Sequence, residues 1–259
     1  MLNIGKAAFI HDWAMTDRHL VILVQPWIND KLIPPIVEGF EWRPEEGFRF
    51  LIVDKDDFSN QRWAQGPARA FYHTGAAWEE SDGTIRLDAA LYKEPVLAVG
   101  GGVDKIRGEW DGRNEGFTSN FTQIVIPPSG DARLVETGLE GDFPQVDPRR
   151  HGLPRRMTAL VSGPSKVHPG HTAISVLDWE TGQADTFDFG DTRMVEEFLF
   201  VPKPGKAGEA ESWLVGPVLN LKTGTTDICV FDAARVSDGP VCIWRGERSW
   251  PLGFHGTWA

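Results

Sequence analysis

Cysteine is scarce in this chain of 259 residues, which contains only Cys229 and Cys242 and no C-x-x-C pair. A disulfide framework or a thiolate metal site needs several closely spaced cysteines, so both classes are excluded. Long apolar runs are missing too. None approaches the roughly 20 residues that span a bilayer, and the sequence therefore predicts no transmembrane helix.

Positive charge is never concentrated. Lys and Arg number 26 against 37 Asp and Glu, which gives a formal net charge of −11. Without a Lys/Arg run, nucleic acid is not an expected partner. An anionic membrane is repelled overall, although an apolar patch would still allow peripheral contact with lipid. The opening residues M-L-N-I-G-K-A-A-F-I-H-D are not typical of a signal peptide, because polar residues and His11 come too early. The expected location is cytoplasmic.

Helical periodicity is absent as well, since no segment keeps a 3.6-residue apolar spacing for more than about two turns. The chain has instead 28 Gly, 18 Pro and 11 Trp, distributed between short apolar runs. Aromatic runs separated by turn residues are typical of short strands with tight connections. The sequence therefore predicts an all-β fold, over a length that can bury a large core.

One scheme of strand, polar turn and strand recurs in the second half. Residues 172–189 read T-A-I-S-V-L-D-W-E-T-G-Q-A-D-T-F-D-F, and W-L-V-G-P-V-L-N-L-K-T-G and I-C-V-F-D-A-A-R-V-S-D-G-P-V-C-I-W repeat the scheme. Successive hairpins of this kind are typical of β-propeller blades, so a propeller is favoured over a sandwich. The Gly-rich, charged residues 100–120 are expected to form a long loop, and loops of this length are often functional.

Seven histidines are candidates for chemistry, and four of them have simpler interpretations. His19 falls in a turn and is expected to be solvated. His151 lies among arginines, where a further cation is unfavourable. His168 and His171 flank Pro-Gly, and a structural loop is favoured there over a metal-binding pair. The remaining three are His11, His73 and His255.

These three histidines lie in F-I-H-D-W-A-M-T-D at 9–17, F-Y-H-T-G-A-A-W-E-E at 71–80 and G-F-H-G-T-W at 253–258. Between the last two come F-P-Q-V-D-P-R-R and E-F-L-F-V-P-K-P-G. In this order the stretches resemble the carotenoid cleavage oxygenase family, the non-haem iron dioxygenases that include apocarotenoid and lignostilbene oxygenases. Ala76 stands where the family usually has asparagine.

The resemblance implies a seven-bladed β-propeller, of which residues 1–259 would form one incomplete domain, with long loops as a cap over a site on the axis. Family members hold Fe(II) through four histidines from different blades. Three of these four ligands match His11, His73 and His255. Neutral imidazoles suit Fe(II) and leave positions open for oxygen.

The resemblance also implies carboxylates that accept the second ring N–H of the ligand histidines and so fix their direction. By position, Asp142 of G-D-F-P-Q would serve His73, with a side chain one methylene shorter than the glutamate of the family. Glu209 of G-E-A-E-S-W would serve His255, and Glu211 could compete with Glu209. Surface carboxylates in turns are the alternative interpretation of these residues.

The implied reaction adds O2 across an alkene and splits it into two carbonyl products. The substrate would be a hydrophobic carotenoid, apocarotenoid or stilbene. In the family, the first ligand histidine and the glutamate that serves the His11 position lie upstream of this motif. The resemblance is thus to the C-terminal half to three-fifths of a member. We therefore expect residues 1–259 alone to bind iron poorly and to cleave substrate slowly or not at all.

The sequence is also compatible with two other kinds of protein. A non-catalytic β-propeller binding module, or an inactive fragment of an oxygenase, would hold no iron and would be insensitive to histidine substitution. A secreted sugar-binding propeller is favoured by the tryptophans but lacks a signal peptide and a motif repeated in each blade. The sequence determines neither the substrate nor the oligomeric state.

Overall fold

A computed structural model of the chain describes residues 2–31, 34, 36–96, 109 and 118–258. Its helices are single 3-10 turns, at Ile36–Gly39, Pro44–Glu46, Pro148–Arg150 and Val236–Asp238. The chain divides into two compact units. Unit 1 covers most of the chain up to Gly138 together with His151–Pro154, and unit 2 covers Leu139–Arg150 and the residues from Arg155 onward. The all-β prediction is confirmed.

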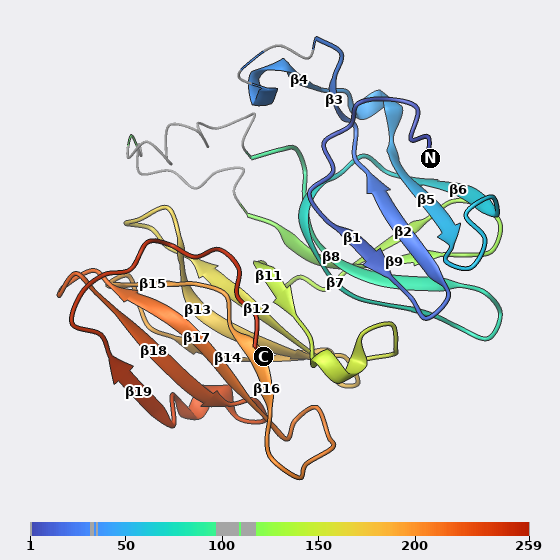
Figure 1. Cartoon of the computed structure of the whole chain (residues 1–259). Coiled ribbons are helices and arrows are strands. Elements are labelled where there is room, and N and C mark those ends of the chain that lie inside the picture. Colours follow the sequence, from blue (N-terminus) through green and yellow to red (C-terminus); the bar gives the residue numbers. More distant parts are fainter. Residues whose placement is uncertain (1, 32–33, 35, 97–108, 110–117, 259) are drawn as a thin grey trace. The chain divides into compact units, whose positions relative to one another are not determined.

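Unit 1 contains two four-stranded antiparallel sheets (Figure 1). The first has the order β1-β2-β5-β6, from Trp13–Met15, His19–Val24, Phe48–Asp54 and Gln61–Gly66. The second has the order β10-β9-β8-β7, from Arg133–Glu136, Asn120–Ile126, Ile85–Tyr92 and Ala70–Glu79. A short pair, β3 (Trp27–Asn29) and β4 (Phe40–Trp42), is inserted between β2 and β5.

The two sheets of unit 1 share one apolar core. Alternate residues of β5, Phe48, Phe50 and Ile52, enter it and are at most 1% exposed, because side chains alternate between the faces of a strand. From the other sheet, Ile85 and Ile124 complete the same cluster. Full burial of each such side chain contributes about 1.5–3 kcal/mol relative to an exposed position.

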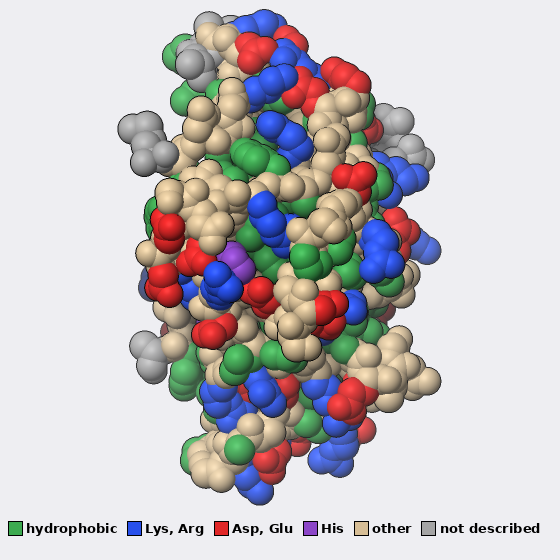
Figure 2. Space-filling view, turned by 90° about the vertical axis from the view of Figure 1, so that its right-hand side faces the viewer, with side chains coloured by type: hydrophobic (Ala, Val, Ile, Leu, Met, Phe, Trp, Pro, Cys, Tyr) green, Lys and Arg blue, Asp and Glu red, His purple; other side chains and the backbone are tan. Residues whose placement is uncertain are grey.

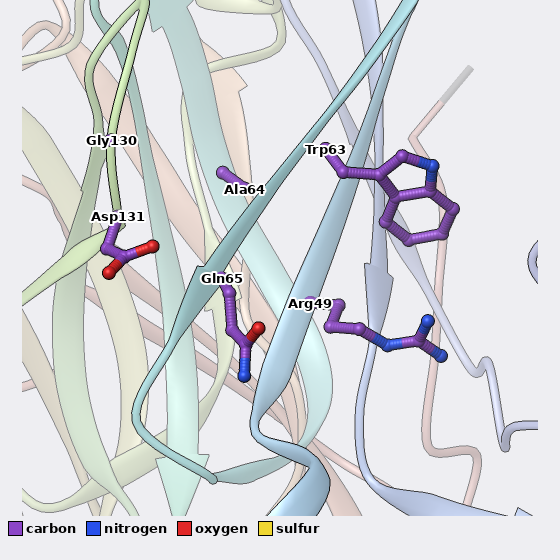
Figure 3. Close-up of a pocket in the computed structure, with 6 residues that line it drawn as sticks. All are labelled: Arg49, Trp63, Ala64, Gln65, Gly130 and Asp131. Atoms are coloured by element: carbon purple, nitrogen blue, oxygen red, sulfur yellow. The ribbon is translucent and has the colours of Figure 1, made fainter.

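The second face of the β1-β2-β5-β6 sheet is less covered. Trp13 and Trp63 are 60% and 43% exposed there, in one row across the sheet that runs through Ile22 and Leu51. The Trp63 ring and the Arg49 guanidinium point to the same side, 5.2 Å apart (Figure 3). A hollow of about 550 Å³ beside them is lined by Arg49, Trp63, Ala64, Gln65, Gly130 and Asp131. None of the predicted site residues lines it.

Unit 2 contains a nine-stranded sheet built from two meanders. The first consists of β11–β14, at Gly141–Gln145, Met157–Pro164, His171–Asp178 and Gln183–Asp188. The second consists of β16–β19, at Leu199–Pro202, Ser212–Asn220, Thr225–Asp232 and Cys242–Arg245. Strand β15 (Arg193–Val195) pairs with both β13 and β17 and so joins the meanders. The three strand–turn–strand stretches found in the sequence are β13–β14, β17 with its turn, and β18–β19.

Phe231 is fully buried in the core of unit 2 and packs against Phe187, Phe189 and Phe198, at ring-centroid distances of 5.4, 5.8 and 5.7 Å. The two cysteines differ sharply. Cys229 belongs to this core and its burial raises the pKa of the thiol to about 12, whereas Cys242 is exposed on β19. Neither forms a disulfide.

The sheets are meanders, open rather than closed into a barrel, and they are compatible with the predicted β-propeller; that the propeller is partial stays a prediction. The loop predicted at 100–120 lies almost wholly outside the described residues, so the predicted cap stays a prediction, as does a single domain over 1–259. Among the described residues, no helix is long and apolar enough to cross a membrane. On the face shown in Figure 2, acidic, basic and apolar side chains are interspersed rather than gathered by kind.

Candidate metal centre

His11 and His73 lie side by side in unit 1. His11 comes just before β1, and His73 is in β7, where the pairing with β8 shifts register between Phe71 and Thr74. Such irregularities re-aim side chains and are common beside functional sites. The two imidazole centroids are 5.2 Å apart and the rings are inclined at 76°. Imidazoles that share one metal ion at about 2.1 Å have ring centres roughly 5 Å apart, so this pair fits a common ion.

A carboxylate joins the two segments that carry these histidines. Asp12 Oδ2 accepts hydrogen bonds from the Thr74 N–H at 2.8 Å and from the Thr74 hydroxyl at 2.6 Å. Asp12 Oδ1 accepts from the Trp13 N–H at 2.7 Å. The residue after His11 is thereby fixed to the residue after His73. Sequence reasoning gave Asp12 no role, although an acidic residue directly after one histidine and a threonine directly after the other were the available signal.

His255 lies in unit 2 beside Glu197. The His255 Nδ1 and Glu197 Oε1 atoms are 3.2 Å apart. A carboxylate accepts, so Nδ1–H donates to Glu197 and the tautomer of the His255 ring is fixed. The side chain of Glu197 is 5% exposed and is held in place by donation from Gln145 Nε2 at 2.7 Å and from the Gly256 N–H at 2.8 Å. The ring of Phe143 packs 5.5 Å from the His255 ring.

The carboxylate predicted to serve His255 has another position. Glu209 accepts from the backbone N–H groups of Arg156 and Met157 at 2.9–3.1 Å and pairs with Arg150 at 3.1 Å. It therefore supports the start of β12, and Glu197 is the carboxylate beside His255. Glu211 accepts from the Gly208 N–H and pairs with Lys206. Glu197, which the sequence analysis missed, is the first residue of E-F-L-F-V-P-K-P-G. That stretch contributed to the family resemblance but was given no role in the site.

Asp142 is buried in β11 and is 4% exposed, in agreement with a role other than solvation. Its Oδ1 accepts from the Phe143 N–H at 2.7 Å. Asp142 belongs to unit 2 and His73 to unit 1. Their pairing stays a prediction, as does a single site that contains His11, His73 and His255.

His168 has a structural role. His168 Nε2 donates to the Arg193 carbonyl at 2.9 Å and its Nδ1 accepts from the Gly170 N–H at 3.1 Å, so both ring nitrogens are used within the protein. Burial lowers the pKa of His171. The expectation that His19 is solvated is wrong, because its side chain is 15% exposed and its Nδ1 lies 2.7 Å from Glu79 Oε2.

Comparisons with known proteins agree with this fold and with these motifs. The family model described as retinal pigment epithelial membrane protein matches residues 1–259. The apocarotenoid-15,15'-oxygenase of Synechocystis is 26% identical, over 97% of this chain and 52% of its own length. The resveratrol cleavage oxygenase 1 of Aspergillus fumigatus is 22% identical, over 97% of this chain and 54% of its own length.

Solved structures show the same fold. The crystal structure of cobalt-substituted Synechocystis ACO superimposes with a TM-score of 0.86 at 21% identity, over 97% of this chain and 53% of the other. The lignostilbene dioxygenase of Pseudomonas brassicacearum gives a TM-score of 0.82 at 19% identity, over 97% and 55%. The chain belongs to the family of these proteins, the carotenoid cleavage oxygenases. It spans about half the length of the relatives it matches.

Proposed function

We propose that His11, His73 and His255 bind a mononuclear non-haem Fe(II) ion in a dioxygenase that cleaves the C=C bond of a carotenoid, an apocarotenoid or a stilbene. The observation that carries the proposal is the close His11–His73 pair in a chain that matches the family over its whole length. For His255, the support is Glu197, which accepts the Nδ1–H and so fixes the tautomer and the direction of the ring. We place the protein in the cytoplasm, with peripheral contact to a membrane as a route to an apolar substrate.

The donor set fits such an ion. Neutral imidazoles bind divalent iron without adding charge, and several other first-row metals accept them too, so the choice of Fe(II) rests on the resemblance in the sequence. A solved relative with the same fold is cobalt-substituted, which supports a divalent-metal centre. The names of the relatives support an apolar alkene as the substrate.

When bound, the iron supplies the activation of O2, and one oxygen atom goes to each of the two carbonyl products. The residues of the chain supply geometry. Asp12 fixes the spacing of His11 and His73 through its two hydrogen bonds to Thr74. Glu197 holds a proton on Nδ1 of His255 and so fixes its tautomer and its ring direction. Asp142 would do the same for His73.

The test combines metal loading with product analysis. We expect the chain loaded anaerobically with Fe(II) to retain iron weakly and to form carbonyl products slowly, or not at all, from a stilbene and an apocarotenal after O2 is admitted. A polypeptide that supplies the remaining length of a family member should raise both. The control is His255→Ala, which should lose iron and any product. Iron retention no greater than that of a His11/His73/His255 triple alanine variant would contradict the proposal and favour a binding module.

A further inference from the structure

Backbone strain concentrates at His255. Among the described residues, the non-glycine residues with positive φ are Phe143, at 53°, and Phe254, at 57°. Phe254 immediately precedes His255, and the ring of Phe143 packs on the ring of His255. A bulky residue adopts this conformation only where its surroundings force it, and such positions cluster at functional sites.

The strain at Phe254 belongs to a three-residue turn. The His255 N–H donates to the Gly253 carbonyl at 2.7 Å, which closes the chain tightly around Phe254. A turn of this size with positive φ at its central residue is rare and strained. Interactions outside the turn must therefore hold it in place.

Two consecutive glutamates supply those interactions. Glu196 Oε2 accepts from the Gly253 N–H at 2.6 Å, on one side of Phe254. Glu197 Oε2 accepts from the Gly256 N–H at 2.8 Å, on the other side. Both glutamates follow β15, which is paired with β13 and β17, so the clamp is anchored in the sheet of unit 2.

We propose that Glu196 and Glu197 form a clamp on residues 253–256, and that Glu196 is a positioning residue that aims His255 without contacting the metal. The inference rests on the proposed function in so far as His255 is a ligand. Glu197 touches the imidazole itself, whereas Glu196 acts on the backbone two residues earlier. To position His255, residue 196 must offer a hydrogen-bond acceptor to the Gly253 N–H, but it does not need a negative charge.

The experiment compares Glu196→Ala with Glu196→Gln in the full chain. The first substitution removes the acceptor, and the second removes the charge but keeps a side-chain oxygen. The metal-free readout is the hydrogen exchange rate of the Gly256 amide by NMR, which reports on the opposite arm of the clamp. The metal readout is the affinity for Co(II), titrated by visible absorption. Glu180→Ala, which removes an exposed carboxylate from the turn after β13, is the control.

We expect Glu196→Ala to speed exchange at Gly256 and to weaken Co(II) binding by about 10–100-fold, the usual effect of losing a partner outside the ligand set. Glu196→Gln and Glu180→Ala should both stay near the wild type. Equal weakening in the alanine and glutamine variants would overturn the proposal, because charge rather than position would then be responsible. Unchanged Gly256 exchange in Glu196→Ala would also overturn it. If His255→Ala binds Co(II) as tightly as the wild type, the ligand role proposed for His255 fails instead, and Gly256 exchange still tests the clamp.

Discussion

Replacement of His73 by alanine is expected to abolish the weak Fe(II) binding proposed for this chain. His73 provides half of the imidazole pair in unit 1, and Asp12 fixes the spacing of that pair through Thr74, so the remaining histidine cannot be re-aimed to compensate. The loss should exceed the about 10–100-fold that follows removal of a partner outside the ligand set. Anaerobic equilibrium dialysis against Fe(II), with the bound metal measured at each free concentration, gives the affinity.

His19→Ala provides the matched control. It removes an imidazole from the same unit, but one that is paired with Glu79 and has no proposed contact with a metal. Its affinity for Fe(II) should equal that of the wild type. If His73→Ala still binds one Fe(II) per chain with unchanged affinity, His73 is not a ligand.

A large loss of stability is expected from Phe231→Ala. The ring is fully buried and packs against three other phenylalanines, so its removal leaves a cavity that the strands of unit 2 cannot fill by small shifts. Large-to-small changes of this kind lower the free energy of unfolding by about 3–5 kcal/mol. Urea unfolding followed by tryptophan fluorescence measures the change.

Phe58→Ala is the corresponding control, because the same side chain is 53% exposed in the turn between β5 and β6. Its effect should stay within about 0.5 kcal/mol, as for most surface substitutions. Equal midpoints for the Phe231 and Phe58 variants would show that the phenylalanine cluster does not determine the stability of unit 2.

The individual strands were predictable from local sequence patterns, whereas the connection of the two meanders into one sheet was not. Residues 172–189 place a short, mostly apolar run and a run that alternates in part on either side of Glu-Thr-Gly, and the structure has β13 and β14 there in antiparallel register. A short apolar or alternating run bounded by turn residues is a local signal that a single sequence contains. The link through β15 is different. It depends on the three residues Arg193–Val195 pairing with strands on both sides, and no periodicity marks so short a segment.

In the candidate site too, some residues were predictable from local sequence motifs and others only from the fold. Short motifs identified His11 and His73, and the structure brings the two together. The partner of His255 was missed because Glu197 and Glu209 are both buried glutamates outside the strands, and only the fold decides which donors surround each one. Glu209 meets backbone N–H groups at the start of β12, and Glu197 meets His255. The conformation of Phe254 could not be foreseen either, because its positive φ is imposed by contacts on both sides.

Because the two cysteines differ in exposure, the rate of thiol modification at Cys229 can report how often the core of unit 2 opens. Only a thiolate reacts with a maleimide or a disulfide reagent. Exposed Cys242 should be modified at once at pH 8, while Cys229, with its pKa raised to about 12, stays protonated and covered. The rate at which Cys229 is modified then depends on how often the core opens. Phe231→Ala should raise that rate. Because the unfolded chain releases the same proton near pH 9, alkaline solution should favour the opened form between about pH 9 and 12.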